Sequence, residues 1–157
     1  MAKFLKIKNT RHAVLIILLA LLFLSSLYLI YLKYSTGSSK VCDLSASINC
    51  STVSNSEYSI ILGVPLPLLG LAYAIFNLVF FLIKHKDENK IPERIMNVLI
   101  NIELMVNTLG ALASLTFLFL QIFEIGAVCI FCLIFDISVL IYTALLYQEF
   151  LAKKPKS

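Results

Sequence analysis

Four long apolar runs constrain this chain more than any other feature of its sequence. They span about residues 13–32, 62–83, 95–120 and 129–151. Each run is long enough to cross about 30 Å of hydrocarbon at ~1.5 Å per residue in an α-helix. Because lipid offers no hydrogen-bond partners to the backbone, each run must be helical in a membrane. The sequence therefore predicts an all-α integral membrane four-helix bundle that forms one domain over residues 1–157.

Composition agrees with a lipid environment. The chain is 60% hydrophobic and 14% charged, with a mean hydropathy of +0.93. A soluble domain is roughly half apolar and about a quarter charged, and a core this small cannot hide the excess. The net charge of +4 lies at the ends of the apolar runs, so we expect membrane lipid and no nucleic acid as a partner. The first apolar run exceeds the ~7–15 residues of a signal peptide core and lacks a cleavage site, which predicts a retained helix.

Basic residues indicate how the helices are oriented. They cluster before the first run, between the second and third, and after the fourth, whereas the other two connections hold only Lys33 and Lys40. The clustered residues are Lys3, Lys6, Lys8, Arg11, Lys84, Lys86, Lys90, Arg94, Lys153, Lys154 and Lys156. The positive-inside rule then places both termini in the cytoplasm of a multi-pass protein of the cell (inner) membrane.

The outward loop, at about residues 33–59, is polar and rich in serine. Ser54 and Glu57 have the spacing of a capping box, which predicts a short surface helix that starts near Ser54. Proline fits the first turn of a helix and breaks a helix further in, so the regular part of the second helix should begin near Pro65 or Pro67.

All four cysteines fall on the outward side. Cys42 and Cys50 lie in the long loop, and Cys129 and Cys132 form a C-x-x-C motif at the start of the fourth helix. Residues three apart share a helix face, and the helix amino terminus stabilises a thiolate. A loop pair on a flexible segment beside a fixed pair that reaches into the bundle can act as a thiol–disulfide relay, with these four cysteines as catalytic residues.

Two other readings of the cysteines stay open. The pairs could be structural disulfides, which are common in exported proteins. Four cysteines could also bind zinc, although the spacing of the loop pair is loose for zinc and an oxidising exterior disfavours free thiolates. We predict no metal site. Four cysteines allow three pairings, and the spacing does not choose among them.

The cysteine-bearing segments resemble a known family. The run Val-Cys-Asp-Leu-Ser-Ala-Ser-Ile-Asn-Cys-Ser-Thr-Val-Ser-Asn-Ser at 41–56 resembles the loop of vitamin K epoxide reductase and its microbial homologues. Cys129-Ile-Phe-Cys132 matches the C-x-x-C of that family. The DsbB-type family, with a similar bundle and similar chemistry, has the C-x-x-C first and the separated pair later, which is the reverse of the order here.

The resemblance implies a mechanism and its participants. A thioredoxin-like protein would hand electrons to Cys42, Cys50 would attack Cys129, and Cys132 would deliver the electrons to a quinone such as menaquinone or ubiquinone. Ser56 would position the loop over the quinone pocket. Some microbial members carry a fused thioredoxin-like domain, for which this chain has no room, so we expect the donor to be a separate protein.

Residues near the C-x-x-C are candidate quinone contacts. Phe131 and Phe135 flank the motif, and Asp136 lies four residues beyond Cys132 on the same helix face. An ionisable group at that depth is costly and usually functional. Asp136 could move protons, or it could be a protonated acid hydrogen-bonded to a neighbouring helix. Vertebrate members use an Asn and a Tyr where this chain has Leu66 and Asp136, which fits quinone reduction better than epoxide reduction.

One face of the third helix carries polar and small residues at helical spacing, namely Glu103, Asn107, Gly110 and Ser114. This face should look into the bundle and pack closely. Taken together, the sequence predicts a quinone-dependent thiol oxidoreductase. The alternative is a non-enzymatic membrane scaffold with two structural disulfides.

Overall fold

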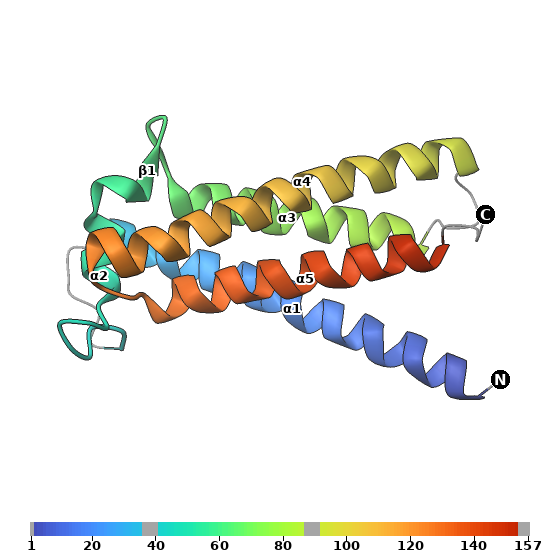
Figure 1. The fold of residues 1–157 in the computed structure, drawn as a ribbon, viewed down its shortest axis with the longest axis horizontal. Helices are drawn as coiled ribbons and strands as arrows, with labels where there is room; N and C mark the ends of the chain where they lie inside the picture. The colour runs from blue at the N-terminus through green and yellow to red at the C-terminus, as the bar shows by residue number, and fades with distance from the viewer. Residues whose placement is uncertain (1, 36–40, 87–91, 154–157) are drawn as a thin grey trace.

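The computed structural model describes residues 2–35, 41–86 and 92–153. It is a bundle of four long helices that lie lengthwise beside one another, with α1 beginning and α5 ending at the same end (Figure 1). The long helices are α1 (Ala2–Tyr34), α3 (Leu66–Lys86), α4 (Glu93–Leu120) and α5 (Ile130–Lys153). The short helix α2 (Cys50–Asn55) covers the other end of the bundle (Figure 1). The predicted all-α bundle is confirmed.

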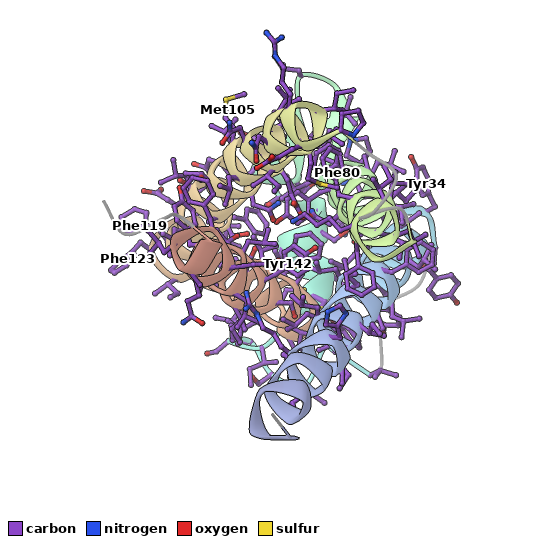
Figure 2. The ribbon with its side chains drawn as sticks, turned by 90° about the vertical axis from the view of Figure 1, so that its right-hand side faces the viewer. Tyr34, Phe80, Met105, Phe119, Phe123 and Tyr142 are labelled. Carbon is purple, nitrogen blue, oxygen red and sulfur yellow. A yellow bond between two sulfur atoms is a disulfide. The ribbon has the colours of Figure 1, made fainter. Side chains whose placement is uncertain are left out.

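The outer surface of the bundle is apolar. Four segments are long and apolar enough to cross a membrane: Thr10–Tyr34, Leu66–Lys84, Glu93–Ile125 and Ile130–Ala152. Large hydrophobic side chains on these segments stay uncovered by protein, and in Figure 2 Met105, Phe119 and Phe123 point away from the bundle while Tyr142 lies between the helices. A soluble protein rarely exposes this much contiguous apolar surface, so lipid is the medium that suits it.

Polar side chains lie inside the bundle instead. Asn77 of α3 and Asn107 of α4 are both fully buried, and Asn107 Nδ2 donates to Asn77 Oδ1 at 2.8 Å. The Tyr73 hydroxyl donates to Asn107 Oδ1 at 2.5 Å. Buried Glu103 forms an ion pair with Lys84. Such side chains join transmembrane helices through interhelical hydrogen bonds.

The predicted inward face of the third helix is confirmed. Glu103, Asn107 and Ser114 are buried. Gly110 lies against the ring of Tyr73, where an added Cβ would be 2.7 Å from a ring carbon. A side chain at this position would collide with the Tyr73 ring, so glycine lets the ring pack directly against the backbone of α4.

The second helix starts later than the predicted 62. Residues Ile60–Ile61 (β1) pair antiparallel with Val64–Pro65 (β2) in a small hairpin. Leu62 and Gly63 make its turn with positive φ angles of 51° and 82°, as a tight hairpin turn requires. The helix therefore begins only at Leu66, between the two prolines that marked its expected start.

The surface helix also begins elsewhere than expected. It starts at Cys50 rather than near Ser54, because the Asn49 side chain caps it by accepting the Thr52 N–H at 2.8 Å. The predicted Ser54 capping box is wrong, since α2 ends at Asn55 and a separate 3-10 turn, η1 (Glu57–Ser59), follows.

The connection between the third and fourth long helices is shorter than residues 121–128, which the predicted helix bounds left between them. The chain continues from α4 into a π-helical turn, η2 (Gln121–Ile125). It stops at Gly126, whose φ of 68° is the left-handed conformation that commonly ends helices.

Candidate redox centre

The cysteine-bearing loop is docked against the start of α5. Ile48 and Val128 form a parallel β-bridge. The Asn49 N–H donates to the Val128 carbonyl at 3.1 Å, and the Val128 N–H donates to the Ser47 carbonyl at 2.9 Å. The sequence suggested a flexible segment, but these paired backbone groups hold the described part of the loop in place.

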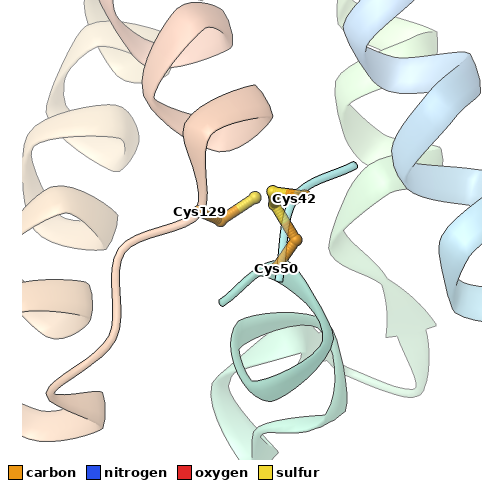
Figure 3. Close-up of side chains that lie close together, drawn as sticks. All are labelled: Cys42, Cys50 and Cys129. Atoms are coloured by element: carbon orange, nitrogen blue, oxygen red, sulfur yellow. A yellow bond between two sulfur atoms is a disulfide. The ribbon is translucent and has the colours of Figure 1, made fainter. Parts of the chain in front are cut away.

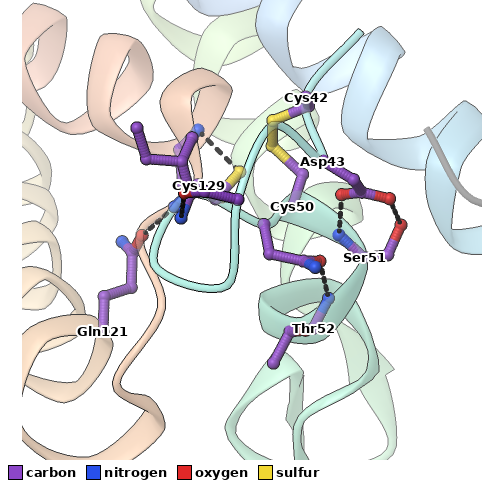
Figure 4. The surroundings of a disulfide bond; sticks show 11 residues. Cys42, Asp43, Cys50, Ser51, Thr52, Gln121 and Cys129 are labelled. Carbon is purple, nitrogen blue, oxygen red and sulfur yellow. Dashed lines mark hydrogen bonds between the residues drawn. A yellow bond between two sulfur atoms is a disulfide. The ribbon is translucent and has the colours of Figure 1, made fainter. Parts of the chain in front are cut away.

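A disulfide joins Cys42 to Cys50, the first residue of α2. Asp43 braces this link, because its carboxylate accepts the Ser51 N–H at 3.0 Å and the Ser51 hydroxyl at 2.5 Å (Figure 4). Asp43 follows Cys42 and Ser51 follows Cys50, so these hydrogen bonds join the two cysteine segments in addition to the disulfide.

Three sulfurs meet at this end of the bundle. The Sγ atoms of Cys42, Cys50 and Cys129 all lie within 4.8 Å of one another, and none of the three residues has exposed surface (Figure 3). Three thiolates at this spacing could also hold a metal ion, but here two of the sulfurs are bonded to each other. A disulfide with a third sulfur beside it is the arrangement that thiol–disulfide exchange requires.

Cys129 caps the helix that it precedes. Its carbonyl accepts the Leu133 N–H at 2.9 Å, and its sulfur accepts the Cys132 N–H at 3.2 Å. A hydrogen bond from the Cys132 thiol lowers the pKa of the Cys129 thiol and outweighs the opposing effect of burial. Cys129 and Cys132 form no disulfide here. Because its thiol has the lowered pKa, Cys129 is the better nucleophile of the pair.

Gln121 fixes Cys129 from the other side. Its Oε1 accepts the Cys129 N–H at 2.9 Å, and its side chain is fully buried (Figure 4). The π-helical turn that contains Gln121 is of a kind often found at functional sites. The sequence analysis missed this residue, because eight residues separate it from Cys129 and no helical or strand periodicity links the two.

An apolar cavity of about 290 Å³ lies inside the bundle below α2. All four long helices and α2 contribute to its wall. Cys132, Phe135 and Asp136 line it from α5, while Gly70 and Tyr73 line it from α3. The deeper cysteine of the C-x-x-C thus borders a space that could hold an apolar ring.

The four candidate quinone contacts fall into two groups. Phe135 and Asp136 line the cavity from α5, and Ser114 lines it from α4. Among the described residues, Phe131 and Ser56 are not part of the lining. Phe131 stacks on Tyr28, with ring centroids 4.0 Å apart. Their assignment as quinone contacts stays a prediction.

Ser56 acts locally on α2. Its hydroxyl donates to the Val53 carbonyl at 2.8 Å, and its N–H donates to the same oxygen at 3.3 Å. Lys33, which the sequence analysis used only to orient the helices, ties α2 to α1. Its Nζ donates to the Ser54 carbonyl at 2.6 Å and to the Ser59 hydroxyl at 3.0 Å.

Comparison with known proteins identifies the relatives of this chain. The model of the vitamin K epoxide reductase family matches residues 13–147. The chain belongs to the vitamin K epoxide reductase family. The sequence resemblance is thereby confirmed, and the match extends through all four long helices of the bundle.

One curated relative is the Thiol-disulfide oxidoreductase LTO1 of Arabidopsis thaliana. It is 33% identical over 113 residues, which are 71% of this chain and 29% of that protein. The chain thus spans less than a third of the length of this relative of the vitamin K epoxide reductase family.

Proposed function

We propose that this chain is a quinone-dependent thiol oxidoreductase that generates disulfides in a separate thioredoxin-like protein. One observation carries the proposal. The Cys129 sulfur lies within 4.8 Å of both sulfurs of the loop disulfide, and Cys132 of the same C-x-x-C lines an apolar cavity. The plant relative is a thiol-disulfide oxidoreductase, which supports the same chemistry.

Electrons would enter through the loop pair. A donor thiolate attacks Cys42, breaks the Cys42–Cys50 bond and releases Cys50 as a thiolate. The second donor thiol then displaces Cys42, so the donor leaves as a disulfide and the loop pair is a dithiol.

The electrons would then pass inward. Cys50 attacks Cys129 of the oxidised C-x-x-C, and Cys132 leaves as a thiolate. Cys42 attacks Cys50 and restores the loop disulfide, which leaves Cys129 and Cys132 as a dithiol. The loop disulfide beside an unbonded Cys129 supports this order of transfer.

A quinone accepts two electrons and two protons and leaves as a quinol. The oxidation of the Cys129–Cys132 dithiol to a disulfide releases the same number of each, so the reaction balances. The cavity fits a quinone ring such as that of menaquinone or ubiquinone, because its wall is mainly apolar and contains a buried acid, Asp136. One Asp136 oxygen, Oδ2, has no hydrogen-bond partner among the described residues. When the acid is protonated, it can donate a hydrogen bond to a quinone oxygen.

The test is quinone reduction by the purified protein with a reduced thioredoxin-like donor. We expect one quinol for each donor disulfide, and no quinol from Cys129→Ser or Cys132→Ser. Titration in a graded redox buffer distinguishes this enzyme from the alternative, a non-enzymatic scaffold with two structural disulfides. Redox-active pairs should titrate near the potential of the donor, whereas structural disulfides resist reduction. Two pairs that stay oxidised across the buffer range, with no quinol formed, would favour the scaffold.

A further inference from the structure

We infer that Ser54 binds the quinone ring, with its hydroxyl donating to one ring carbonyl while Asp136 serves the other. The inference rests on the proposed function and adds a residue to its site. Ser54 belongs to α2, which also begins with Cys50. The covering helix would then contribute both a sulfur to the relay and a contact to the electron acceptor.

The Ser54 hydroxyl is buried and unpaired. The residue is 8% exposed and lines the cavity, and its Oγ has no hydrogen-bond partner among the described residues. A buried hydroxyl without a partner is costly, and native proteins rarely leave one unless a ligand or water completes it. The Lys33 ammonium fixes the Ser54 carbonyl at 2.6 Å, so the backbone that carries this hydroxyl is held over the cavity.

The other polar groups of the described cavity wall are already engaged. The Ser26 hydroxyl donates to the Leu22 carbonyl at 2.7 Å, the Ser59 hydroxyl accepts from Lys33, and the Tyr73 hydroxyl donates to Asn107. The Ser114 hydroxyl is not among the buried side-chain oxygens that lack a partner in the described part of the chain. Two described residues of the lining keep a buried side-chain oxygen without a hydrogen-bond partner, Ser54 Oγ and Asp136 Oδ2, and a turn of either side chain would bring its oxygen to the cavity.

The number and the chemistry of these two atoms suit a quinone ring, and they come from two different helices, α2 and α5. A para-quinone ring is apolar except for two carbonyl oxygens on opposite sides, and both oxygens are acceptors. Ser54 can donate from α2, and Asp136 in its neutral form can donate from α5. An apolar wall with a few convergent polar groups is the usual form of a small-molecule site.

The first experiment compares stability and quinone affinity in Ser54→Ala. Without quinone, we expect the melting temperature to stay the same or rise, because the change removes an unpaired buried hydroxyl. With quinone, we expect the affinity to fall about 3- to 10-fold, the usual loss for one hydrogen bond. Ser25→Ala is the matched control. Ser25 is a buried serine whose hydroxyl already donates to the Leu21 carbonyl at 2.5 Å, so its removal should leave the affinity unchanged.

The second experiment reads the hydrogen bond directly. A quinone with ¹³C at one carbonyl gives separate infrared bands for its two carbonyls when bound. Ser54→Ala should raise the frequency of one band toward that of a free carbonyl, and Asp136→Asn should affect the other band.

Three outcomes would contradict the inference. If Ser54→Ala changes neither the bands nor the affinity, the inference is wrong, although the proposed function still stands when the wild type reduces quinone. A fall in affinity together with a lower melting temperature and unchanged bands would show a structural role and would also overturn the inference. A wild type that neither binds nor reduces any quinone would refute both.

Discussion

At the scale of single residues, the chemistry depends on how the structure distinguishes Cys129 from Cys132. Cys129 accepts hydrogen bonds at the amino end of α5, next to the loop disulfide. Cys132 lies one turn further along, on the cavity wall. The three-residue spacing thus places the Cys129 sulfur beside the loop disulfide and the Cys132 sulfur beside the cavity proposed for the quinone.

The acidity of Cys129 should depend on Cys132. Because a hydrogen bond from the Cys132 thiol lowers the pKa of Cys129, Cys132→Ala should raise that pKa toward the ordinary value for a cysteine. Thiolate absorbance in the ultraviolet, measured against pH with the loop pair oxidised, reports the change. In the wild type the Cys129 thiolate should persist as pH falls below the ordinary cysteine value, and in the variant it should be lost at a higher pH. Coincident titration curves would contradict this account.

Asp136 should matter for quinone reduction and not for disulfide exchange. Asp136→Asn keeps a similar shape and can still hydrogen-bond, so we expect the fold and the exchange between cysteine pairs to survive. Quinone reduction should slow by up to about 100-fold, as is typical when a general acid is lost. The comparison is donor oxidation with quinone against disulfide exchange without it, in the same variant. Unchanged quinone turnover would mean that Asp136 only packs against Ser114.

At the scale of elements, α2 and the docked loop determine whether the sulfurs meet. Asn49 both caps α2 and pairs with Val128, so one residue fixes the helix and the loop together. Asn49→Ala removes the cap, which is typically worth ~1 kcal/mol. We expect the amides of α2 to exchange hydrogen about fivefold faster as a result.

Asn55→Ala is the control for that experiment. It changes the same residue type at the other end of α2, where the side chain is exposed. Surface substitutions of this kind usually change stability by less than about 0.5 kcal/mol. Equal hydrogen exchange in the two variants would show that the Asn49 cap does not hold α2.

The order of the relay predicts which mixed disulfide accumulates. Cys132→Ser removes the thiol that expels Cys50 from Cys129, so a Cys50–Cys129 bond should form and persist. Adding Cys42→Ser removes the other route of resolution, and with a thiol oxidant such as diamide added to accept the two electrons from Cys50 and Cys129 the yield should increase. Mass spectrometry of the trapped protein identifies the bond. Recovery of only the Cys42–Cys50 disulfide from Cys132→Ser would contradict the proposed order.

The elements also show where sequence-based reasoning succeeds and fails. The long helices were predictable because length and apolarity alone require them in lipid. The cavity wall was predictable in part, since Phe135 and Asp136 follow the C-x-x-C along one helix. The hairpin at Leu62, the docking of the loop on Val128 and the Gln121 contact were not predictable, because each depends on segments that meet only after the bundle forms.

At the scale of the whole molecule, the bundle has two unlike ends. The short helix α2, the hairpin and the start of α5 lie at one end, and the start of α1 and the end of α5 lie at the other (Figure 1). Cys50 begins α2 and Cys129 directly precedes α5, so the cysteines belong to the first of these ends. With four spanning helices, the orientation of one end fixes that of the other. The basic residues predict that the cysteine end faces outward.

Introduced cysteines can test this orientation in a chain whose native cysteines are replaced by serine. Leu62→Cys places a thiol at the hairpin tip, where Leu62 is 98% exposed, and Leu151→Cys places one at the other end, where Leu151 is 64% exposed. A membrane-impermeant maleimide should label Leu62→Cys in intact cells and Leu151→Cys only after the membrane is opened. The reverse pattern would show the opposite orientation.

The loop disulfide between Cys42 and Cys50 is buried, which limits when a donor protein can exchange electrons with it. Cys42 and Cys50 have no exposed surface, so a donor protein can reach Cys42 only after the loop around it moves. Cys50 is joined to Cys42, so this movement would also take Cys50 away from Cys129 and interrupt the inner transfer. The relay would then have two states with alternating access. In one state the donor protein reaches Cys42, and in the other Cys50 reaches Cys129, so electrons never pass from donor to quinone in a single state.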